Sequence, residues 1–210
     1  DGRNLFSFLL GHWNVHYRNS GRNFSEKINL DGTFGIVERS EADIVGISEI
    51  LEGQEVNLTE GLRRIGYSHI FFGGGHKTKF GGLTVQTAIA SKLECEKRDA
   101  GNFPIRNEMG GGGGFVHCYF PEKDIDVINL HLASPKKREL YQSQLNFVND
   151  YVGRFEGNVI LMGDFNKSYE SMEPSFEGVN FVSEARKTCP TTFGLGFLCK
   201  DLDHIFSRGF

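Results

Sequence analysis

The stretch Asn158-Val-Ile-Leu-Met-Gly-Asp-Phe-Asn166 decides the fold. Its apolar run predicts a strand over 158–162 that is buried on both faces, and Gly163 then leads into a carboxylate and an amide. Side chains two residues apart on a strand project to the same side, so Asp164 and Asn166 are expected to face one point. Open α/β sheets bind ligands at the carboxyl ends of their strands, where this pair would lie. The carboxylate could take a proton from an attacking water while the amide orients it; an ordinary Asp/Asn turn after a strand is the alternative.

Polar side chains stand at the ends of four other predicted strands. In Asn129-Leu-His131-Leu, His131 could give a hydrogen bond or a proton to a phosphate oxygen, or be an ordinary histidine satisfied at a strand end. The strand that begins at Ile44 ends in Glu49, and a carboxylate buried there is costly unless a cation pairs with it. Mg²⁺ typically takes one or two carboxylates and keeps several waters, so Glu49 is a candidate ligand. The remaining two ends are Trp13-Asn14-Val15 and Leu202-Asp203-His204.

Short apolar runs alternate with helical patterns, which predicts a mixed α/β architecture. The clearest helix spans 136–155, with Ser134 as its N-cap and Pro135 at its first position. A shorter helix is expected around 58–65 with Asn57 as its cap. Another is expected over 33–39, and the irregular pattern of residues 168–200 favours no particular assignment. The predicted strands are 6–15, 44–48, 69–72, 83–90, 115–120, 126–132, 158–162 and 202–207.

The composition fits one enzyme-sized domain. A chain of 210 residues can bury a sizeable core. The net charge of −4 is not the footprint of a basic nucleic-acid-binding domain, although a metal ion or a local patch can supply positive charge. No apolar stretch approaches the roughly 18 residues of a membrane span. The four cysteines are expected as free thiols in a reducing compartment, which favours the cytoplasm; a Cys189–Cys199 disulfide is the alternative, and the compartment stays open.

Together, these motifs resemble those of the endonuclease/exonuclease/phosphatase superfamily. That superfamily includes DNase I-like nucleases, apurinic/apyrimidinic endonucleases, tyrosyl-DNA phosphodiesterases, neutral sphingomyelinases and inositol-polyphosphate phosphatases. The resemblance covers essentially the whole chain and follows the order of the family's motifs. These are Trp13-Asn14 (W-N), Ser48-Glu49 (Q-E, with Ser for Gln), Thr87–Lys92 (the A-I-L-S strand), Asn129–Leu132 (T-x-H-L), Gly163–Asn166 (G-D-F-N) and Leu202–Ile205 (I-D-H-I).

The resemblance implies both a fold and a set of roles. The fold is a DNase I-like four-layer α/β sandwich, in which two mixed or mostly antiparallel β-sheets are flanked by helices and the site lies at one end of the sheets. Glu49 would bind Mg²⁺, or Mn²⁺ in its place, with Asn14 beside it. Asp164 would activate or position the attacking water, and Asn166 would hold water or phosphate. His131 would stabilise charge on the phosphate oxygens or assist the leaving group.

One family motif has no counterpart in the sequence. The family pattern implies that Asp203 pairs with a catalytic histidine from a later S-D-H strand, and nothing after Asp203 supplies that motif. His204 is not expected to replace it, because neighbouring residues on a strand point to opposite faces. We therefore expect residues 1–210 to form a single endonuclease/exonuclease/phosphatase domain that lacks the final S-D-H strand, in a chain that is incomplete as given.

Three functions stay open at this point. A Mg²⁺-dependent nuclease or DNA-repair phosphodiesterase is favoured, because His131 stands where DNase I-like and tyrosyl-DNA-type members carry histidine. Nucleic acid would then be the substrate of a monomeric enzyme, and Lys77 with the run Lys136-Lys137-Arg138 would contact its phosphates. A solvated charged face is the ordinary alternative for such a run. The other two functions are a phosphatase or lipid phosphodiesterase of the inositol phosphate or sphingomyelin type, and a non-catalytic binding module.

Overall fold

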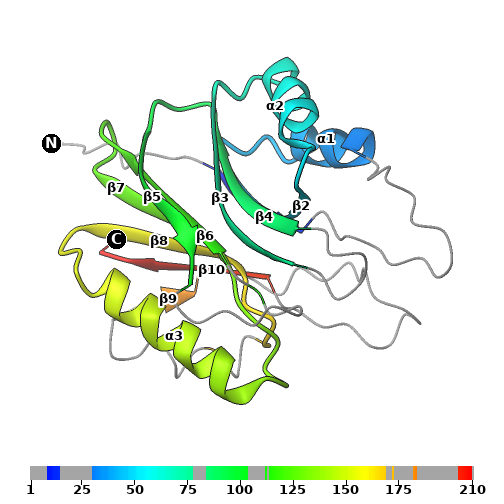
Figure 1. The fold of residues 1–210 in the computed structure, drawn as a ribbon. Coiled ribbons are helices and arrows are strands. Elements are labelled where there is room, and N and C mark those ends of the chain that lie inside the picture. The colour runs from blue at the N-terminus through cyan, green and yellow to red at the C-terminus, as the bar shows by residue number, and fades with distance from the viewer. Residues whose placement is uncertain are drawn as a thin grey trace, which may run out of the picture.

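Two β-sheets pack face to face in the computed structural model of the chain, which describes residues 9–14, 30–77, 84–103, 112, 114–168, 172, 182–183 and 203–209 (Figure 1). The four-stranded sheet has the order β1-β2-β4-β3 and the six-stranded sheet the order β5-β6-β7-β8-β10-β9. β1 is parallel to β2 and β7 to β8, while the other described pairs are antiparallel. The strands are β1 (Leu10–Asn14), β2 (Ile44–Leu51), β3 (His69–Lys77), β4 (Thr84–Ser91), β5 (Glu96–Asn102), β6 (Gly114–Phe120), β7 (Ile125–His131), β8 (Asn158–Asp164), β9 (Val182–Ser183) and β10 (Asp203–Arg208).

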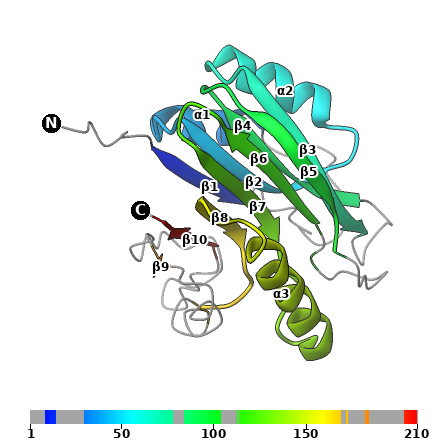
Figure 2. The same ribbon diagram turned by 90° about the vertical axis from the view of Figure 1, so that its left-hand side faces the viewer.

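Helices cover the outer faces of both sheets, and apolar side chains fill each interface between layers (Figures 1 and 2). Leu58 is one of the residues that pack the first two helices on the four-stranded sheet. Leu145 packs the third helix on the six-stranded sheet, and Ile89 and Val116 belong to the core between the sheets. The expected four-layer sandwich is therefore confirmed. The helices are α1 (Leu30–Arg39), α2 (Glu55–Arg64) and α3 (Arg138–Val152).

Each predicted strand overlaps an observed one, but β5 and β9 were not predicted. The sequence of β5 is Glu-Lys-Arg-Asp-Ala-Gly-Asn, and its residues are exposed or half-buried. It offers neither an apolar run nor an alternation, so the period-2 signal of a strand is missing. β5 is extended because its backbone pairs with β6, from Glu96 opposite Tyr119 to Asn102 opposite Gly114. Charged side chains are suited to this position at the edge of the sheet. β9 lies within 168–200, where the irregular pattern gave no assignment.

The predicted start of α3 is wrong. The helix begins at Arg138 with Lys137 in the N-cap position, and not at Pro135. The Lys137 N–H donates to the carbonyl of Ser134 (2.9 Å), so these residues form a turn that precedes the helix. Lys136 and Lys137 were expected inside the first helical turn, but they precede it. Lys137 and Arg138 still lie at the N-cap and at the first position of α3, next to the positive end of the helix dipole.

The other two helices overlap their predictions, but the cap of α2 is misplaced. α2 begins at Glu55 with Gln54 in the N-cap position, and Asn57 lies inside its first turn. The Leu58 N–H already donates to the Gln54 carbonyl (2.9 Å), so helical hydrogen bonding starts before Asn57. Among the residues that the structure describes, no helix is both long and apolar enough to cross a membrane.

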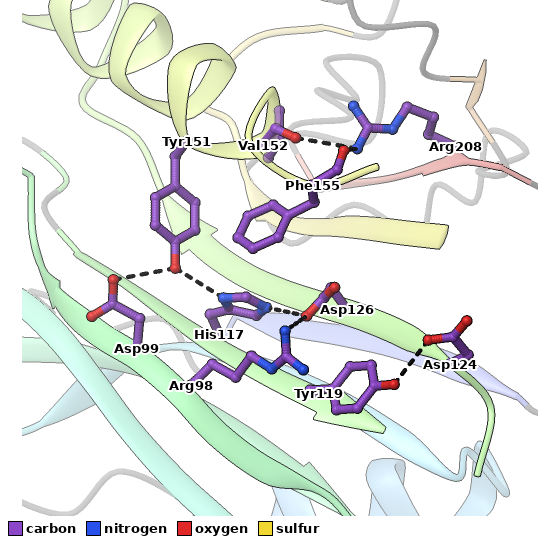
Figure 3. A network of polar contacts seen from close by, with 10 residues as sticks. All are labelled: Arg98, Asp99, His117, Tyr119, Asp124, Asp126, Tyr151, Val152, Phe155 and Arg208. Atoms are coloured by element: carbon purple, nitrogen blue, oxygen red, sulfur yellow. Dashed lines mark hydrogen bonds and ion pairs between the residues drawn. The ribbon is translucent and has the colours of Figure 1, made fainter. Parts of the chain in front are cut away.

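A polar network anchors α3 to the six-stranded sheet (Figure 3). The Tyr151 hydroxyl, near the end of α3, lies 3.2 Å from Asp99 Oδ2 on β5 and 2.8 Å from His117 Nδ1 on β6. His117 Nε2 lies 2.7 Å from Asp126 Oδ1 on β7, and Arg98 approaches the same carboxylate at 3.7 Å. The Tyr151 hydroxyl and the buried His117 imidazole thus connect one helix to three strands.

The pH dependence of stability tests this network. Burial lowers the pKa of His117, and the charge of Arg98 adds to this against the opposing effect of Asp126 and Asp99. The folded pKa then lies below the unfolded value of about 6.5, so the unfolded chain binds more protons within that window. The free energy of unfolding should therefore fall as the pH drops below about 6.5. We expect a smaller fall between pH 7 and pH 5 in His117→Gln, measured by urea unfolding. Equal slopes would contradict the assignment, since the other titrating groups are common to both proteins.

Candidate metal and phosphoester site

Three strand ends of the six-stranded sheet bring polar side chains together around Asp164. β7 and β8 are parallel, and their register places His131 beside Asp164. β10 is antiparallel to β8 on the other side and places Asp203 next to Asp164. His131 and Asp203 are 33 and 39 positions away from Asp164 in the sequence (164 − 131 and 203 − 164). Only the strand pairing makes them its neighbours. The position at the carboxyl ends of parallel strands is the one expected for a ligand site.

The four-stranded sheet contributes a second carboxylate to the same point. One ligand atom each from Glu49, His131 and Asp164 lies within 4.8 Å of the others. His131 Nε2 is 3.7 Å from Asp164 Oδ2, and both of these side chains are buried while Glu49 is half-buried. The site therefore lies where both sheets end, with β2 on one side and β7 and β8 on the other.

A β-bulge directs Glu49 into the site. Ile47 pairs with Ala88 and Ile50 with Gln86, so Ser48 and Glu49 together oppose a single residue of β4. Glu49 has a φ of 62°, in the left-handed region that non-glycine residues rarely adopt. Bulges re-aim side chains and are frequent beside active sites, and strained backbone of this kind persists where the surrounding structure enforces it. The sequence shows the carboxylate at the strand end but contains no signal for the bulge.

The carboxylates of the site are close enough to affect each other's ionisation. Burial raises the pKa of Asp164 above its usual range, and the negative charges of Asp203 and Glu49 add to this rise. His131 and the backbone N–H of Asn166 act in the opposite direction. A divalent cation between the carboxylates would offset both the desolvation and the repulsion. The donor set fits such an ion, because carboxylate oxygens from Glu49 and Asp164 are the hard ligands that Mg²⁺ and Mn²⁺ prefer.

Asn166 reaches the site by a turn and not by strand alternation, which corrects the sequence-based expectation. β8 ends at Asp164, and Asn166 has a left-handed φ of 54°. Its backbone N–H donates to Asp164 Oδ1 (2.8 Å), which is the Asp-anchored turn that was the alternative. Its side-chain Nδ2 donates to the Leu132 carbonyl just beyond β7 (2.8 Å). Asn166 thus orients the Asp164 carboxylate and ties the ends of β7 and β8 together.

Gly163 permits the close approach of β8 to β7 immediately before Asp164. Its φ is 148°, and a Cβ at this position would lie 2.0 Å from the Leu130 carbonyl oxygen. We expect Gly163→Ala to lower the free energy of unfolding by about 2–4 kcal/mol, because both the backbone and the neighbouring strand must shift. Urea unfolding measures this effect. Gly157→Ala is the matched control, since a Cβ there meets nothing within 4 Å. Equal losses in the two variants would contradict this account of Gly163.

His76 is a site residue that the sequence did not indicate. The predicted strand 69–72 ends before it, but β3 extends through His76 to Lys77. Its ring lies edge-on to that of His131 with centroids 5.4 Å apart. Burial lowers the pKa of His76 to about 3, and the positive charges of His131 and Lys137 contribute, so its imidazole is neutral at neutral pH. No motif connects these two histidines, because they meet only through the packing of β3 on the other sheet.

The four cations expected at the substrate phosphates lie in two segments, one at the end of β3 and one at the start of α3. Lys77 is exposed at the end of β3, directly after His76. Lys137 is half-buried, and its charge acts on His76. Lys136 and Arg138 are exposed in the turn and at the first position of α3.

Three further expectations concern residues near the site. The backbone of Asn14 pairs with Ser48, one residue before Glu49, but the side chain of Asn14 lies outside the described residues. His204 is buried with its Nε2 2.7 Å from the Lys167 carbonyl, so it occupies a structural position as expected. Cys95 and Cys118 are free and buried, which agrees with the expectation of free thiols. The alternative pair, Cys189 and Cys199, lies outside the described residues.

Comparison with solved structures identifies the class of fold. No protein-family model matches the chain, and no curated protein matches it significantly. An endonuclease/exonuclease/phosphatase family protein from Leptotrichia buccalis C-1013-b superposes with a TM-score of 0.68 at 15% identity, over 93% of this chain and 85% of that one. Truncated Caenorhabditis elegans TDP2 gives 0.61 at 18%, over 86% and 76%. ANGEL2, described as a 2',3'-cyclic phosphatase in complex with adenosine-2',3'-vanadate, gives 0.63 at 16%, over 95% and 83%.

The chain has the DNase I-like fold of the endonuclease/exonuclease/phosphatase superfamily. This confirms the fold that the resemblance of the sequence motifs implied. A fold can host more than one function, so the activity and the substrate have to be argued from the site.

Proposed function

We propose that this protein is a Mg²⁺-dependent phosphoester hydrolase that cleaves phosphodiester bonds of nucleic acids. The observation that carries the proposal is the meeting of Glu49, His131 and Asp164 within 4.8 Å, from strands of two different sheets. Placing two carboxylates beside an imidazole without a bound cation would be energetically unfavourable, because each buried charge loses its hydration. A divalent cation and a phosphate together supply the charges that the three side chains can stabilise.

Each residue has a role that follows from its position. Glu49 and Asp164 would hold the cation, with Asn14 beside Glu49 as a further ligand. When bound, Mg²⁺, or Mn²⁺ in its place, supplies Lewis-acid polarisation of the phosphoryl oxygens. Asp164 would also position an attacking water beside the cation and accept its proton.

The remaining polar groups would act on the substrate or on Asp164. His131 would donate a hydrogen bond to a phosphoryl oxygen or to the leaving oxygen. Asn166 would hold the Asp164 carboxylate in place through its backbone N–H and offer its side chain to water or phosphate. Asp203, beside Asp164 in the sheet, would orient a catalytic histidine.

Nucleic acid is the proposed substrate because cationic residues adjoin His76 on β3 and follow His131 in the chain. Lys77 lies at the end of β3, directly after His76. The segment that follows His131 contains Lys136 and Lys137 before α3 and Arg138 as its first residue. Such side chains neutralise phosphates on either side of a cleaved bond. The likeness to ANGEL2, which is described with an adenosine-2',3'-vanadate ligand, is consistent with a nucleotide substrate.

A panel of substrates tests the proposal. Plasmid DNA, oligonucleotides with abasic or 5′-blocked ends, RNA, sphingomyelin and inositol phosphates would each be incubated with the natural full-length protein, with Mg²⁺ and with EDTA. We expect cleavage of a nucleic acid that requires Mg²⁺ and weakens as salt concentration rises. Cleavage of only sphingomyelin or an inositol phosphate would assign the lipid or phosphatase function instead. Absence of turnover on all substrates would favour a non-catalytic binding module.

A further inference from the structure

Asn129 is a buried amide that crosses the interface between the two sheets. It lies on β7 with 0% of its surface exposed, and its side chain reaches the four-stranded sheet. Its Nδ2 donates to the Ile47 carbonyl on β2 (3.1 Å) and to the Ala88 carbonyl on β4 (2.9 Å). Both partners are acceptors, so the NH₂ group of the amide must be the end that faces them. One side chain therefore holds two strands of the opposite sheet.

The two carbonyls belong to the last regular pair before the bulge. Ile47 is paired with Ala88, and the register then shifts so that Ser48 and Glu49 form the bulge. A bulge disrupts the hydrogen-bond ladder locally, and the two N–H groups of Asn129 provide donors where it begins. Backbone held at this point restricts the residues that follow, including Glu49 with its φ of 62°.

The same segment of β7 also carries His131. Asn129 and His131 are two residues apart on one strand, so their side chains project to the same face. The distance between Glu49 and His131 is thus set through a short connection: His131 is on β7, Asn129 is on β7, and Asn129 binds the residue two positions before Glu49.

The Asn129 amide fits in the interface because residue 46 is a glycine, and its buried oxygen makes this position energetically unfavourable. A Cβ on Gly46 would lie 2.6 Å from Asn129 Oδ1 and 2.8 Å from its Cγ, so the glycine is what leaves space for the amide. Asn129 Oδ1 has no hydrogen-bond partner among the described residues. Burying an acceptor without a partner is unfavourable, and an apolar side chain would fill the interface between the sheets without that cost. Packing alone therefore does not explain why residue 129 is a polar asparagine.

We infer that Asn129 is a positioning residue that holds the Ser48–Glu49 bulge and thereby sets the position of the Glu49 carboxylate for a divalent cation. This inference rests on the proposed function, in which Glu49 is a ligand of that cation. It assigns Asn129 no contact with the substrate or the metal. Residues that orient a metal ligand from outside the first shell commonly change metal affinity about 10- to 100-fold when they are replaced.

Asn129→Leu removes both donors while keeping the branched arrangement of side-chain heavy atoms, and Val127→Ala is its matched control. Val127 lies on the same strand and the same face, is fully buried, and makes packing contacts in the core between the sheets. Mg²⁺ affinity would be measured by titration calorimetry, and by the rise in melting temperature on adding Mg²⁺, for variants shown to be folded by circular dichroism. We expect about a tenfold or greater loss of Mg²⁺ affinity in Asn129→Leu and an unchanged affinity in Val127→Ala.

A second variant keeps the test decisive if Asn129→Leu does not fold. Asn129→Ser retains one short donor, and we expect its Mg²⁺ affinity to be reduced as well. Wild-type affinity in a folded Asn129 variant would overturn the inference and leave the proposed function standing. An equal loss of affinity in Val127→Ala would also overturn it, because the effect would then be general loosening. Absence of Mg²⁺ binding in the wild-type protein would overturn the proposed function, and this inference with it.

Discussion

Replacing Asp164 with asparagine is expected to lower kcat/KM for phosphoester hydrolysis by about 10³-fold, within the range that general acid–base groups contribute. The substitution keeps the shape of the side chain and its hydrogen bond from the Asn166 N–H, which is 2.8 Å long. It removes the negative charge that would bind the cation and accept the proton. Stability should change little or rise, because the buried carboxylate, whose pKa is raised chiefly by burial, no longer has to be ionised. Activity and urea unfolding of the same preparation would measure both effects.

Asp126→Asn is the matched control for this variant. Asp126 is another buried aspartate of the six-stranded sheet, and its contacts are with His117 and Arg98, away from the site. We expect Asp126→Asn to lower stability while kcat/KM stays within a small factor of wild type. If Asp164→Asn kept wild-type activity, or if both variants lost activity equally, the role assigned to Asp164 would be wrong.

Replacing Glu49 with glutamine is expected to raise the Mg²⁺ concentration that gives half-maximal activity by at least about 100-fold, because Glu49 is a direct ligand and loss of an outer-shell partner alone costs about 10- to 100-fold. The amide keeps the size of the side chain but supplies a neutral oxygen to a hard cation, whose binding depends on carboxylate charge. A part of the lost rate should return at high Mg²⁺, which distinguishes weakened metal binding from loss of a catalytic group. Activity measured across a Mg²⁺ titration gives this value directly.

Glu52→Gln provides the control for charge alone. Glu52 is exposed just beyond the end of β2, so it alters the net charge by the same amount near the same strand. We expect its Mg²⁺ requirement to equal that of the wild-type protein. A Mg²⁺ requirement in Glu49→Gln that matched Glu52→Gln would remove Glu49 from the metal site.

The residues of the site could be predicted from the sequence because the chemistry and the strand ends coincide in the chain. Apolar runs that stop at Asp164 and at His131 place polar groups where buried strands end, and parallel pairing then makes them neighbours. Glu49 was predicted for the same reason. What could not be predicted is how Glu49 turns inward, because a bulge depends on the register of β2 against β4 and leaves no composition signal.

The interactions that the sequence did not reveal are those made across the interface between the sheets. His76 meets His131, and Asn129 binds the carbonyls of Ile47 and Ala88, at sequence separations of 41 to 82 residues for the Asn129 bonds. Local patterns carry no information on such contacts, since they arise only when two complete sheets pack. β5 was missed for a related reason: its extended backbone depends on pairing with β6, and its own residues do not favour a strand.

The central claim is that residues from both sheets hold one divalent cation, and crystals grown or soaked with Mn²⁺ test it most directly. Anomalous diffraction from Mn²⁺ locates the ion without assuming any activity. The account predicts one strong peak among Glu49, His131 and Asp164, in coordination contact with the Glu49 and Asp164 carboxylates, and loss of that peak in Glu49→Gln at the same Mn²⁺ concentration. A well-ordered site without a peak, or a peak bound elsewhere and unaffected by Glu49→Gln, would contradict it.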